Sequence, residues 1–381
     1  MGAENEIDKR LAELRSEIDA LDEKLLALLN SRAACSIEVG RIKAGASDQV
    51  FKPSREKALL EKLIIGNEGP LPEKHLRAIY REILSSSRRL QRPQRVAYLG
   101  PEGTFSYFAG VEFLGHNADF VSKPGLEDVF RAVTDGDCEL GIIPLENSLH
   151  GTVGQSLDMF LSYPAFIQSE LFCKINQSVL GRAESLIEVK TVYSHPQPLA
   201  QCSRWISTHM PEARIIPTES TAAAADRAAR EPGAVAIGHK GLAKLFSLEI
   251  LASGIEDLAD NWTRFVVVGQ ATGKGEGNDK TSLLFTLPDK PGSLVTVLET
   301  LSQRGINMKK LESRPIRGEK WKYVFFVDVE CDLENPEYAD VLETLRQQCH
   351  TLRLLGSYPA GPHLEVSEAE PESRPQTGGA S

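Results

Sequence analysis

Apolar residues recur at helical spacing at the start of the chain, and neither proline nor glycine interrupts residues 6–39. This pattern predicts one long helix over residues 6–43, with an apolar stripe formed by Leu11, Leu14, Ile18, Leu21, Leu25, Leu28 and Leu29. Two shorter helices are predicted over residues 53–65 and 72–91. The long helix would rise about 55 Å, more than the two shorter helices can cover. We therefore expect a second copy of the chain to complete this core, in a homodimer or in a tetramer built from dimers.

The pattern changes after the Arg-Pro-Gln sequence at residues 92–94, which is typical of a linker. Residues 95–99 form a short apolar run that ends at a Gly-Pro pair, as a strand followed by a turn would. Helical patterns alternate from there with further apolar runs, at 140–143, 191–193, 234–237 and 265–268. The three helices predict an all-helical domain over residues 1–92. The alternating strands and helices that follow predict an α/β domain over residues 95–270.

Residues 271–279, with the sequence ATGKGEGND, form a glycine-rich segment. A nucleotide-binding loop is disfavoured because the segment lacks the G-x-G-x-x-G and GK[ST] spacings and no predicted helix follows it. We interpret the segment as a hinge. Residues 280–360 then have a strand-helix-strand-strand-helix-strand pattern, which predicts a ferredoxin-like α+β domain. The tail at 361–381 is rich in Pro, Glu, Ser and Gly, and we expect it to be disordered.

Composition narrows the classes of function. The 381 residues carry a formal net charge of -10, which argues against a nucleic acid or an anionic membrane as partner. No run approaches 18 apolar residues and the first ten residues are polar, so we expect no export signal, no membrane span and a cytoplasmic location. The six cysteines include no CxxC pair and no histidine at ligand spacing. We therefore expect reduced thiols, no disulfide framework and no metal site.

Two cations of the long helix suit an anionic ligand. Arg32 and Lys43 lie 11 residues apart, close to three turns, so they share one helix face. Their Cα atoms would be about 16 Å apart, a gap that two long side chains can close around a small dianion. Arg15 lies about 100° around the helix from Arg32 and would serve the pocket of a second copy instead. Solvated surface cations beside a coiled-coil stripe remain an alternative interpretation.

The stretches LRSEIDALDEKLLALLNSR, EVGRIK and PSREKALL closely resemble the all-helical chorismate mutase domain, over residues 6–91. A Claisen rearrangement of chorismate to prephenate requires confinement of one conformer and donors where charge develops, but no acid, base or nucleophile. Lys52 stands where some relatives carry Asp, which leaves its role open. The resemblance implies carboxylate-binding Arg32 and Arg55, ether-binding Lys43 and Gln91, hydroxyl-binding Glu56, pocket-lining Ser87, and Arg15 from the opposite subunit.

Five short motifs lie at predicted strand ends and turns of the α/β domain: YLGPEGTFS (98–106), PLENSLHGTV (144–153), SHPQPLAQC (194–202), ESTAAAA (219–225) and NWTRF (261–265). Each motif alone is explained by turns and helix caps. Together, in this order, they closely resemble prephenate dehydratase over residues 95–269. The resemblance implies two α/β lobes, similar to periplasmic binding proteins, with the site in the cleft between them.

The resemblance assigns Thr263 to the departure of the C4 hydroxyl of prephenate. Loss of water and carbon dioxide creates an aromatic ring, so a well-placed weak donor is sufficient. A hydrolase built on Ser194 and His195 is disfavoured because no G-x-S-x-G elbow is present and sequence neighbours point apart. The residues implied to bind or orient the substrate are Thr104, Ser106, Glu146, Asn147, Ser194, Gln197, Gln201, Ser220, Thr221, Arg264 and Phe265.

The sequences DKPGSLVTVL (289–298) and LESRP (311–315) resemble the ACT regulatory domain of prephenate dehydratases, which implies L-phenylalanine as an inhibitory effector. The free N–H groups of the predicted helix start after Pro291 suit a carboxylate, although a plain helix cap explains them equally well. The implied effector contacts are Gly292, Ser293 (where alanine is more usual), Leu294, Glu312, Ser313 and Arg314.

The whole chain therefore predicts a cofactor-free bifunctional enzyme of phenylalanine biosynthesis that takes chorismate to prephenate and prephenate to phenylpyruvate. One alternative is a dehydratase that prefers arogenate, since the same motifs would serve. A second alternative is a catalytically silent sensor of an aromatic ligand. The presence of Thr263, Arg32 and Lys43 weighs against a silent sensor, which has no need of all three.

Overall fold

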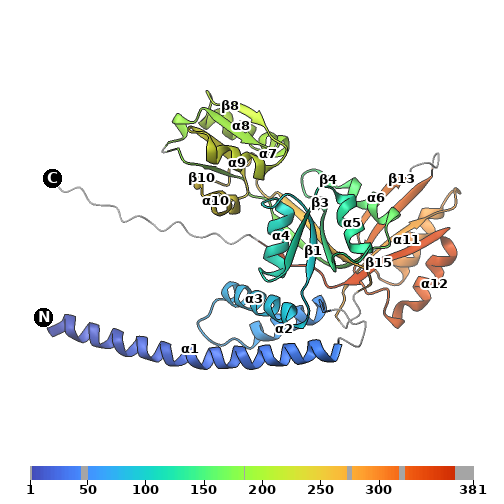
Figure 1. The fold of residues 1–381 in the computed structure, drawn as a ribbon. Helices are drawn as coiled ribbons and strands as arrows, with labels where there is room; N and C mark the ends of the chain where they lie inside the picture. Colours follow the sequence, from blue (N-terminus) through green and yellow to red (C-terminus); the bar gives the residue numbers. More distant parts are fainter. Residues whose placement is uncertain (1, 44–49, 184, 273–276, 317–321, 365–381) are drawn as a thin grey trace.

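The computed structural model describes residues 2–43, 50–183, 185–272, 277–316 and 322–364. The first unit consists of three helices, α1 (Gly2–Lys43), α2 (Pro53–Ile65) and α3 (Glu73–Gln91). Helix α1 extends well beyond the other two, as predicted (Figure 1). Its apolar stripe is uncovered, with Leu21 60% and Leu28 69% exposed. None of the described helices has the length and apolar character needed to cross a bilayer.

The second unit is α/β and has two lobes. The sheet of lobe 1 has the order β16-β5-β11-β3-β1-β2, with β4 paired to β3. Strands β1, β2 and β3 are parallel, whereas β11 runs antiparallel to both of its neighbours. The elements of lobe 1 are β1 (Arg95–Leu99), α4 (Phe105–Leu114), β2 (Asp119–Lys123), α5 (Leu126–Thr134), β3 (Leu140–Asn147), β4 (Gly151–Thr152), α6 (Gly154–Ser162), β5 (Phe166–Lys174), β11 (Trp262–Gly269) and β16 (His363–Leu364).

Lobe 2 is inserted between β5 and β11, so the chain crosses twice between the lobes. Its sheet has the order β10-β6-β9-β7-β8, and it forms the separate body at the top of Figure 1. This arrangement confirms the predicted two-lobed α/β fold. The elements of lobe 2 are β6 (Ser178–Gly181), η1 (Leu186–Glu188), β7 (Thr191–Ser194), α7 (Pro196–Gln201), α8 (Ser203–His209), β8 (Arg214–Pro217), α9 (Thr221–Arg230), β9 (Ala234–Gly238), α10 (Gly241–Phe246) and β10 (Glu249–Ser253).

The third unit has a four-stranded antiparallel sheet in the order β13-β14-β12-β15, which is the predicted ferredoxin-like arrangement. Side chains alternate along β12: Leu283 and Phe285 pack under the helices, whereas Leu284 faces lobe 1 and shares a core with Phe160 and Ile167. The elements are β12 (Lys280–Thr286), α11 (Ser293–Gln303), β13 (Met308–Pro315), β14 (Tyr323–Val329), η2 (Pro336–Tyr338), α12 (Ala339–Gln348) and β15 (Thr351–Tyr358).

The prediction of a disordered tail over residues 361–381 is wrong for residues 363–364. His363 and Leu364 form β16, which pairs in parallel with β5, and the His363 ring stacks on Phe172 with centroids 4.6 Å apart. Strand β5 is otherwise an edge strand, and its unpaired backbone groups provide partners that composition does not reveal. Residues 365–381 of the tail and residues 273–276 of the expected hinge lie outside the described residues.

Candidate functional sites

Thr263 and Asn147 form a hydrogen-bonded pair at the ends of two neighbouring strands. They are register partners on β11 and β3, so their side chains lie on the same face of the sheet of lobe 1. Asn147 Nδ2 donates to Thr263 Oγ1 over 3.0 Å, and both residues are buried. Because the hydroxyl oxygen accepts this bond, its own proton is left to donate, and no described residue accepts it.

The side-chain amide of Asn147 is held in one orientation by the turn that follows β3. Its Oδ1 accepts hydrogen bonds from the backbone N–H groups of Leu149 and His150, at 3.1 and 3.0 Å. The Nδ2 group therefore has to face Thr263 and Asn261, and it donates to Asn261 Oδ1 over 2.7 Å. Asn261 is 2% exposed, and its Nδ2 has no partner among the described residues. Three residues thus fix the direction of one hydroxyl group.

Lobe 2 brings amide side chains to the same end of the cleft. Gln177 Nε2 donates to Gln201 Oε1 over 3.2 Å, and Gln201 lies 3.4 Å from the His150 ring of lobe 1. Gln177 is 1% exposed, and its Oε1 has no partner among the described residues. Gln197, in contrast, is exposed one turn earlier on α7. Amide side chains of lobe 2 therefore lie next to the turn of lobe 1 that holds Asn147.

The other predicted hydroxyls begin helices. Thr104 caps α4: its Oγ1 accepts from Tyr107 N and donates to the carbonyl of Leu99. Ser220 caps α9 by accepting from Ala223 N, while Ser106 and Thr221 lie buried in the first turns of these helices. The two helix starts meet across the lobes, because a Cβ added at Gly103 would lie 2.4 Å from Leu242 and 3.5 Å from Ala222.

A cavity of about 740 Å³ opens between the same two helix starts. Its lining includes Glu102, Glu219 and Asp226, with Lys123 as the only cation among its lining residues. Carboxylates repel a dianion, so this cavity is poorly suited to an anionic substrate. The region around Thr263, where the amide groups of Asn147, Gln177 and Gln201 gather, suits such a substrate better.

Ser194 and His195 do not form a nucleophile and base. Ser194 is fully buried and donates to the carbonyl of Ile237 over 2.6 Å. His195 Nδ1 accepts from the backbone N–H of Gln197 as the cap of α7. These contacts give both side chains structural roles and disfavour a hydrolase that uses this pair.

Arg264 and Glu146 lie on the opposite face of the sheet from Thr263 and Asn147. They are register partners, with Arg264 Nη1 3.8 Å from Glu146 Oε2, and Arg264 is 4% exposed. The resemblance implied that both bind substrate, but strand alternation turns them away from the Thr263 hydroxyl. Phe265 is buried in the core between β11, β5 and α4, where it packs rather than lining the cleft.

Arg264 is the centre of a buried polar cluster between lobe 1 and the third unit. It contacts Glu170 of β5, Asp328 of β14 and the hydroxyl of Tyr358 of β15, and Lys280 of β12 donates to Glu170 over 2.8 Å. Burial would raise the pKa of Asp328, but Arg264 and Lys280 hold it below its usual value. Burial raises the pKa of Tyr358 well above its usual value. Two cations and two carboxylates thus balance in charge, which a buried cluster requires.

The first unit brings together part of the predicted mutase site. Arg32 of α1 donates to Ser87 Oγ of α3, and Gln91 Nε2 donates to the carbonyl of Ser87 over 3.2 Å. The helices touch one turn further on, because a Cβ at Gly40 would lie 2.8 Å from the backbone of Gln91. Glycine therefore allows α1 and α3 to approach closely beside Lys43, the last residue of α1.

The remaining predicted mutase residues are spread over α1 and α2. Glu56 accepts two hydrogen bonds from Arg88 Nη1, at 2.7 and 2.6 Å, so an ion pair holds the carboxylate that was assigned to the substrate hydroxyl. Arg55 is exposed on α2. Arg15 is exposed near the far end of α1, about 25 Å along the helix from Arg32. Arg15 cannot reach the pocket of its own chain.

The predicted effector residues lie on α11 and β13. Gly292 has a φ of 87°, which favours glycine, and it caps α11, where Ser293 and Leu294 form the first turn. On β13 the side chains alternate: Glu312 accepts from Thr152, and Arg314 pairs with Asp158, both in lobe 1, whereas Ser313 is exposed. Among the described residues, no hydrogen bond or ion pair joins the two sets within one chain, and Glu312 and Arg314 bind lobe 1 instead.

Comparison with known proteins now adds to this geometry. Three family sequence models match the chain in order: Chorismate mutase type II over residues 14–92, Prephenate dehydratase over 96–273 and ACT domain over 281–347. A bifunctional chorismate mutase/prephenate dehydratase of Aquifex aeolicus (strain VF5) is 39% identical over 355 residues, which is 92% of this chain and 98% of the relative. The chain belongs to the bifunctional chorismate mutase/prephenate dehydratase family.

Solved structures share the fold of the last two units. A prephenate dehydratase from Arthrobacter aurescens in complex with L-Phe is 31% identical, with a TM-score of 0.63 over 70% of this chain and 90% of that one. A structure described as GqqA, a novel type of quorum quenching acylase, is 29% identical, with a TM-score of 0.63 over 70% of this chain and 98% of that one. The fold thus occurs with more than one described activity, and only the residues of a site distinguish them.

Three residues of the cleft were not assigned from the sequence: Asn261, Gln177 and His150. Asn261 lies within the NWTRF motif, and strand alternation alone places it on the face of Thr263, so this signal was available. Gln177 comes from the crossing between β5 and β6, 86 residues before Thr263 in the sequence, and no local pattern marks it. Its place depends on how the two lobes meet.

Proposed function

We propose that this chain rearranges chorismate to prephenate in its helical unit and converts prephenate to phenylpyruvate between its two α/β lobes, without a cofactor. The single observation that carries the second activity is the Asn147–Thr263 hydrogen bond. It leaves one hydroxyl proton pointing from a buried, neutral setting, next to further amide donors of both lobes. Family membership supports the same pair of reactions.

In the dehydration, the C–C bond to the ring carboxylate breaks and its electron pair completes the aromatic ring, while the C4–O bond breaks and its pair leaves on oxygen. Thr263 donates a hydrogen bond to this oxygen as it becomes hydroxide, and one proton taken up from the bulk solvent converts this hydroxide to the leaving water. Carbon dioxide, water and phenylpyruvate are the products. Asn147 stabilises the Thr263 oxygen in return, since it donates to that oxygen throughout.

The amides of lobe 2 would bind the carboxylates of the substrate. We assign this role to Gln201 and Gln177, which already face lobe 1, and to Gln197 after closure of the lobes. Ser194, Thr104, Ser106, Ser220 and Thr221 would shape the cleft through the helix starts and strand ends that they hold. Arg264, Glu146 and Phe265 are better explained as supporting residues behind the catalytic strands.

In the rearrangement, two arginines would hold the two carboxylates of chorismate in a compact conformer, and two donors would stabilise the charge that develops on the ether oxygen. We assign the carboxylates to Arg32 and Arg55, and the ether oxygen to Lys43 and Gln91. The contact of Arg32 with Ser87 supports this arrangement, since it joins α1 to α3, and the hydrogen bond of Gln91 to the carbonyl of Ser87 places Gln91 beside it on α3. Glu56 would bind the substrate hydroxyl only after exchange of its Arg88 partner.

We further propose a homodimer through α1. The uncovered stripe of α1, with Leu25 54% and Leu28 69% exposed, supports a second copy as its partner, because water disfavours an apolar surface of this extent. In an antiparallel pair, Arg15 of a second copy would lie near Arg32 and complete the mutase pocket. A tetramer would require a further interface, for which the exposed face of β13 with Leu311 and Ser313 is available.

L-Phenylalanine is the effector that the third unit supports best. The similar prephenate dehydratase from Arthrobacter aurescens was solved with L-Phe, and the ACT domain family model matches residues 281–347. We propose that phenylalanine binds near the start of α11 and the exposed face of β13 and inhibits the dehydratase. The absence of a membrane-crossing helix among the described residues and the free thiols are consistent with a cytoplasmic enzyme.

Reciprocal substitutions test the two activities in one experiment. Thr263→Val keeps the side-chain shape but removes the donor, and we expect the dehydratase kcat to fall by about 10²–10³, with mutase activity within two-fold of the wild type. Arg32→Ala should lower mutase kcat/KM by about 10²–10³ and leave the dehydratase unchanged. Thr208→Val, at an exposed position of α8, controls for loss of a threonine hydroxyl. Ultraviolet assays with chorismate and prephenate follow each step.

Loss of both activities from either variant would contradict the assignment to separate sites. Two other functions are distinguished by the same assays. An arogenate-preferring enzyme would process arogenate faster than prephenate, and a silent sensor would bind phenylalanine but consume neither substrate. An acylase is disfavoured because Ser194 and His195 are both held by backbone contacts.

A further inference from the structure

The catalytic strands β3 and β11 present different residues to the two sides of the sheet. Asn147 and Thr263 face the cleft, whereas their sequence neighbours Glu146 and Arg264 face the third unit. Asn147 is bonded directly to Glu146, and Thr263 directly to Arg264, and the third unit contacts both Glu146 and Arg264. A backbone shift at Glu146 or Arg264 therefore displaces Asn147 or Thr263, because successive side chains share one strand backbone.

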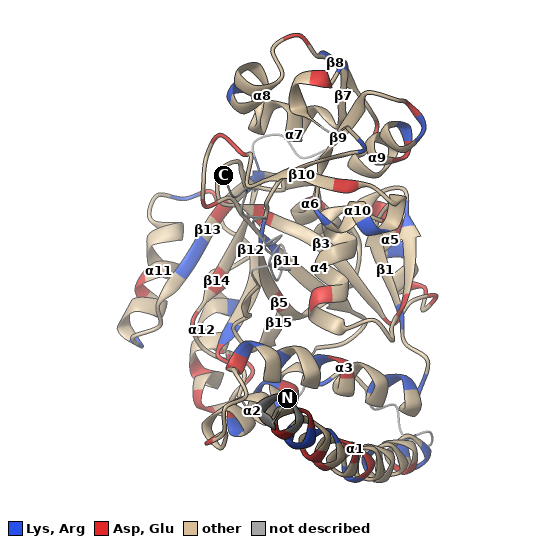
Figure 2. Cartoon of the chain, turned by 90° about the vertical axis from the view of Figure 1, so that its left-hand side faces the viewer, with Lys and Arg blue, Asp and Glu red and all other residues tan. Residues whose placement is uncertain are grey.

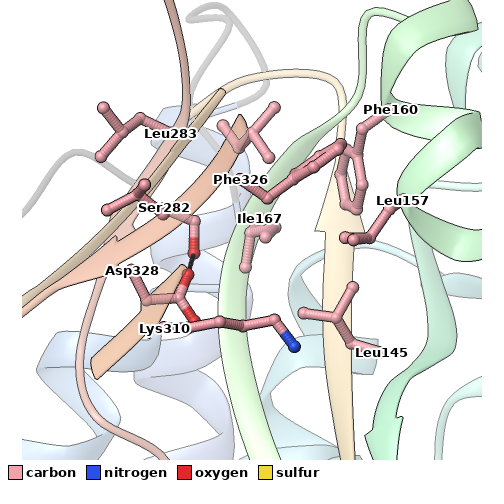
Figure 3. Close-up of a pocket in the computed structure, with 11 residues that line it drawn as sticks. Leu145, Leu157, Phe160, Ile167, Ser282, Leu283, Lys310, Phe326 and Asp328 are labelled. Carbon is pink, nitrogen blue, oxygen red and sulfur yellow. Dashed lines mark hydrogen bonds between the residues drawn. The ribbon is translucent and has the colours of Figure 1, made fainter. Parts of the chain in front are cut away.

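The contact to Glu146 comes from Lys310 of β13. Lys310 Nζ lies 2.9 Å from Glu146 Oε2 and donates to Thr152 Oγ1 over 2.7 Å. Figure 3 shows the side chain extending from β13 towards Leu145 of β3, past Asp328. It lines a cavity of about 10 Å³ between lobe 1 and the third unit, which is room for about one water molecule. The Lys310 ammonium thus bridges the two units beside a small cavity that is lined mainly by apolar side chains.

The contact to Arg264 differs in kind. Arg264, Glu170 and Asp328 are each at most 5% exposed and hold one another through charged hydrogen bonds. Removal of one partner would leave an unpaired buried charge, which costs about 3–5 kcal/mol. We therefore expect the contacts of this cluster to stay in place. Glu146 has a side chain that is 37% exposed, and water can reach it when Lys310 withdraws. The Lys310–Glu146 pair is therefore the adjustable contact of the two.

We propose that Lys310 is a positioning residue of the dehydratase site, through which β13 of the third unit sets the geometry of Asn147 and Thr263. With Lys310 bound to Glu146, the end of β3 is held and Asn147 donates to Thr263. A shift of β13 on effector binding loosens this contact and moves Asn147 away from its partner. This inference rests on the proposed dehydratase activity and its inhibition by phenylalanine.

Side chains along β13 alternate in direction, so that every second residue faces lobe 1 and the others face solvent. Glu312 and Arg314 face lobe 1 through Thr152 and Asp158, and Figure 2 shows β13 at the edge of the third unit. Lys309, by contrast, points away and pairs with Glu330 over 3.0 Å, with its side chain 55% exposed. Two neighbouring lysines thus have the same chemistry and opposite directions. Lys309 is therefore the matched control for Lys310.

The experiment compares Lys310→Met and Lys309→Met in the full-length protein. For Lys310→Met we expect the dehydratase kcat to fall about three- to ten-fold with KM within two-fold, since substrate contacts are untouched. Saturating phenylalanine should inhibit the wild type and Lys309→Met at least about ten-fold, but Lys310→Met less than about two-fold. Phenylalanine binding, measured by calorimetry, should persist in all three proteins, and mutase activity serves as an internal measure of folding.

Two outcomes would overturn the inference: inhibition of Lys310→Met equal to that of Lys309→Met, or a rise in KM with kcat unchanged. Glu146→Gln provides a second, nearly isosteric variant with less risk to folding. It should reproduce the effects of Lys310→Met, and the double variant should be no worse than either single variant. If Glu146 bound the substrate directly, Glu146→Gln would raise KM and Lys310→Met would not. A wild type without dehydratase activity, or one that phenylalanine does not inhibit, would instead contradict the proposed function itself.

Discussion

The two proposed active sites of this chain use different chemistry on different scaffolds. The mutase site is a set of cations on two helices, and Arg15, Arg32 and Arg55 are exposed or half-buried. The dehydratase site is a set of neutral hydroxyls and amides at strand ends, with Thr263, Asn147 and Asn261 all buried. In our proposal the first site requires Arg15 of a second copy, whereas the Asn147–Thr263 pair of the second site is in hydrogen-bond contact within one copy.

This difference follows from the reactions. A pericyclic step gains from charges that compress a dianion, and long arginine side chains on a solvated helix can supply them without a large desolvation cost. Departure of a hydroxyl group needs one donor held in one direction, which a buried sheet provides because its backbone is fixed on both sides. The mutase site should therefore depend on assembly, and the dehydratase site on internal order.

The largest expected effect comes from disrupting the proposed dimer, which should abolish one activity and spare the other. Leu21→Glu combined with Leu25→Glu places charges on the exposed stripe of α1, where these residues are 60% and 54% exposed. We expect dissociation to monomers and a loss of mutase activity of at least about 10²-fold, because Arg15 no longer reaches the pocket of a second copy. The dehydratase should keep at least half of its kcat. Light scattering gives the mass, and the two ultraviolet assays give the activities.

Ile187→Glu is the matched control, since Ile187 is 91% exposed in lobe 2, far from α1 in the sequence. It should change neither mass nor activity. A double α1 variant that stays dimeric would contradict the proposed interface. A monomer with full mutase activity would contradict the proposal that the mutase site needs a second copy.

An intermediate effect tests internal order in the dehydratase site. Asn261→Leu removes the acceptor that holds Asn147 Nδ2, so we expect the dehydratase kcat to fall about ten- to a hundred-fold, with KM changed less than about three-fold. Asn261→Asp retains an acceptor oxygen and should keep more activity than Asn261→Leu, although a buried carboxyl group is the less stable replacement.

The relative activity of Asn261→Leu and Asn261→Asp decides between a role in catalysis and a role in stability alone. If Asn261 only stabilised the fold, activity would follow the free energy of unfolding and Asn261→Asp would be the weaker enzyme. Mutase activity should stay unchanged in both variants, because Asn261 lies in lobe 1 and outside the helical unit.

The last prediction concerns pH and the contact between the lobes, and it bears on stability instead of on activity. His239 is 3% exposed, stacks on Phe108 of α4 with ring centroids 4.0 Å apart, and burial lowers its pKa to about 3. The folded protein therefore keeps His239 neutral, while the unfolded chain binds a proton below about pH 6.5. Stability should fall by about 1.4 kcal/mol per pH unit from this group alone as the pH drops from 6.5 towards 4.

His239→Phe preserves the ring stack and removes the proton, so its unfolding free energy should fall less steeply over this range than that of the wild type. Urea unfolding between pH 4 and 7, followed by tryptophan fluorescence, measures both slopes. His75→Phe, at an exposed position of α3, controls for loss of a histidine. Parallel curves for the wild type and His239→Phe would show that the lobe contact tolerates a charged ring.

Much of the fold was predictable because it depends on local patterns. The long helix, the helix at 53–65 and the four strands and two helices of the third unit follow hydrophobic periodicity, and the structure confirms them within a few residues. The exposure of Leu28 on α1 follows from helix length alone. Strand alternation would also have placed Asn261 with Thr263 and turned Arg264 away, although motif resemblance assigned Thr263, Arg264 and Phe265 together to the substrate.

Other features depended on segments far apart in the sequence. Arg264 meets Glu170 and Asp328 across 94 and 64 residues, and nothing near any of the three marks the others as partners. The same holds for β16, whose residues resemble a disordered tail until the edge of β5 provides a partner. The pairing of Lys310 with Glu146 requires the open face of one sheet to pack on another.

The sequence by itself determined the helices and strands, the order of the three units and the residue types available for each reaction, because periodicity and turn chemistry act over a few residues. The tertiary structure alone decided which of those residues face the cleft, which support it from behind, and which remain uncovered on α1. Those outcomes depend on burial of apolar surface between distant segments, where one strand carries the Thr263 hydroxyl on one side and the buried Arg264 on the other.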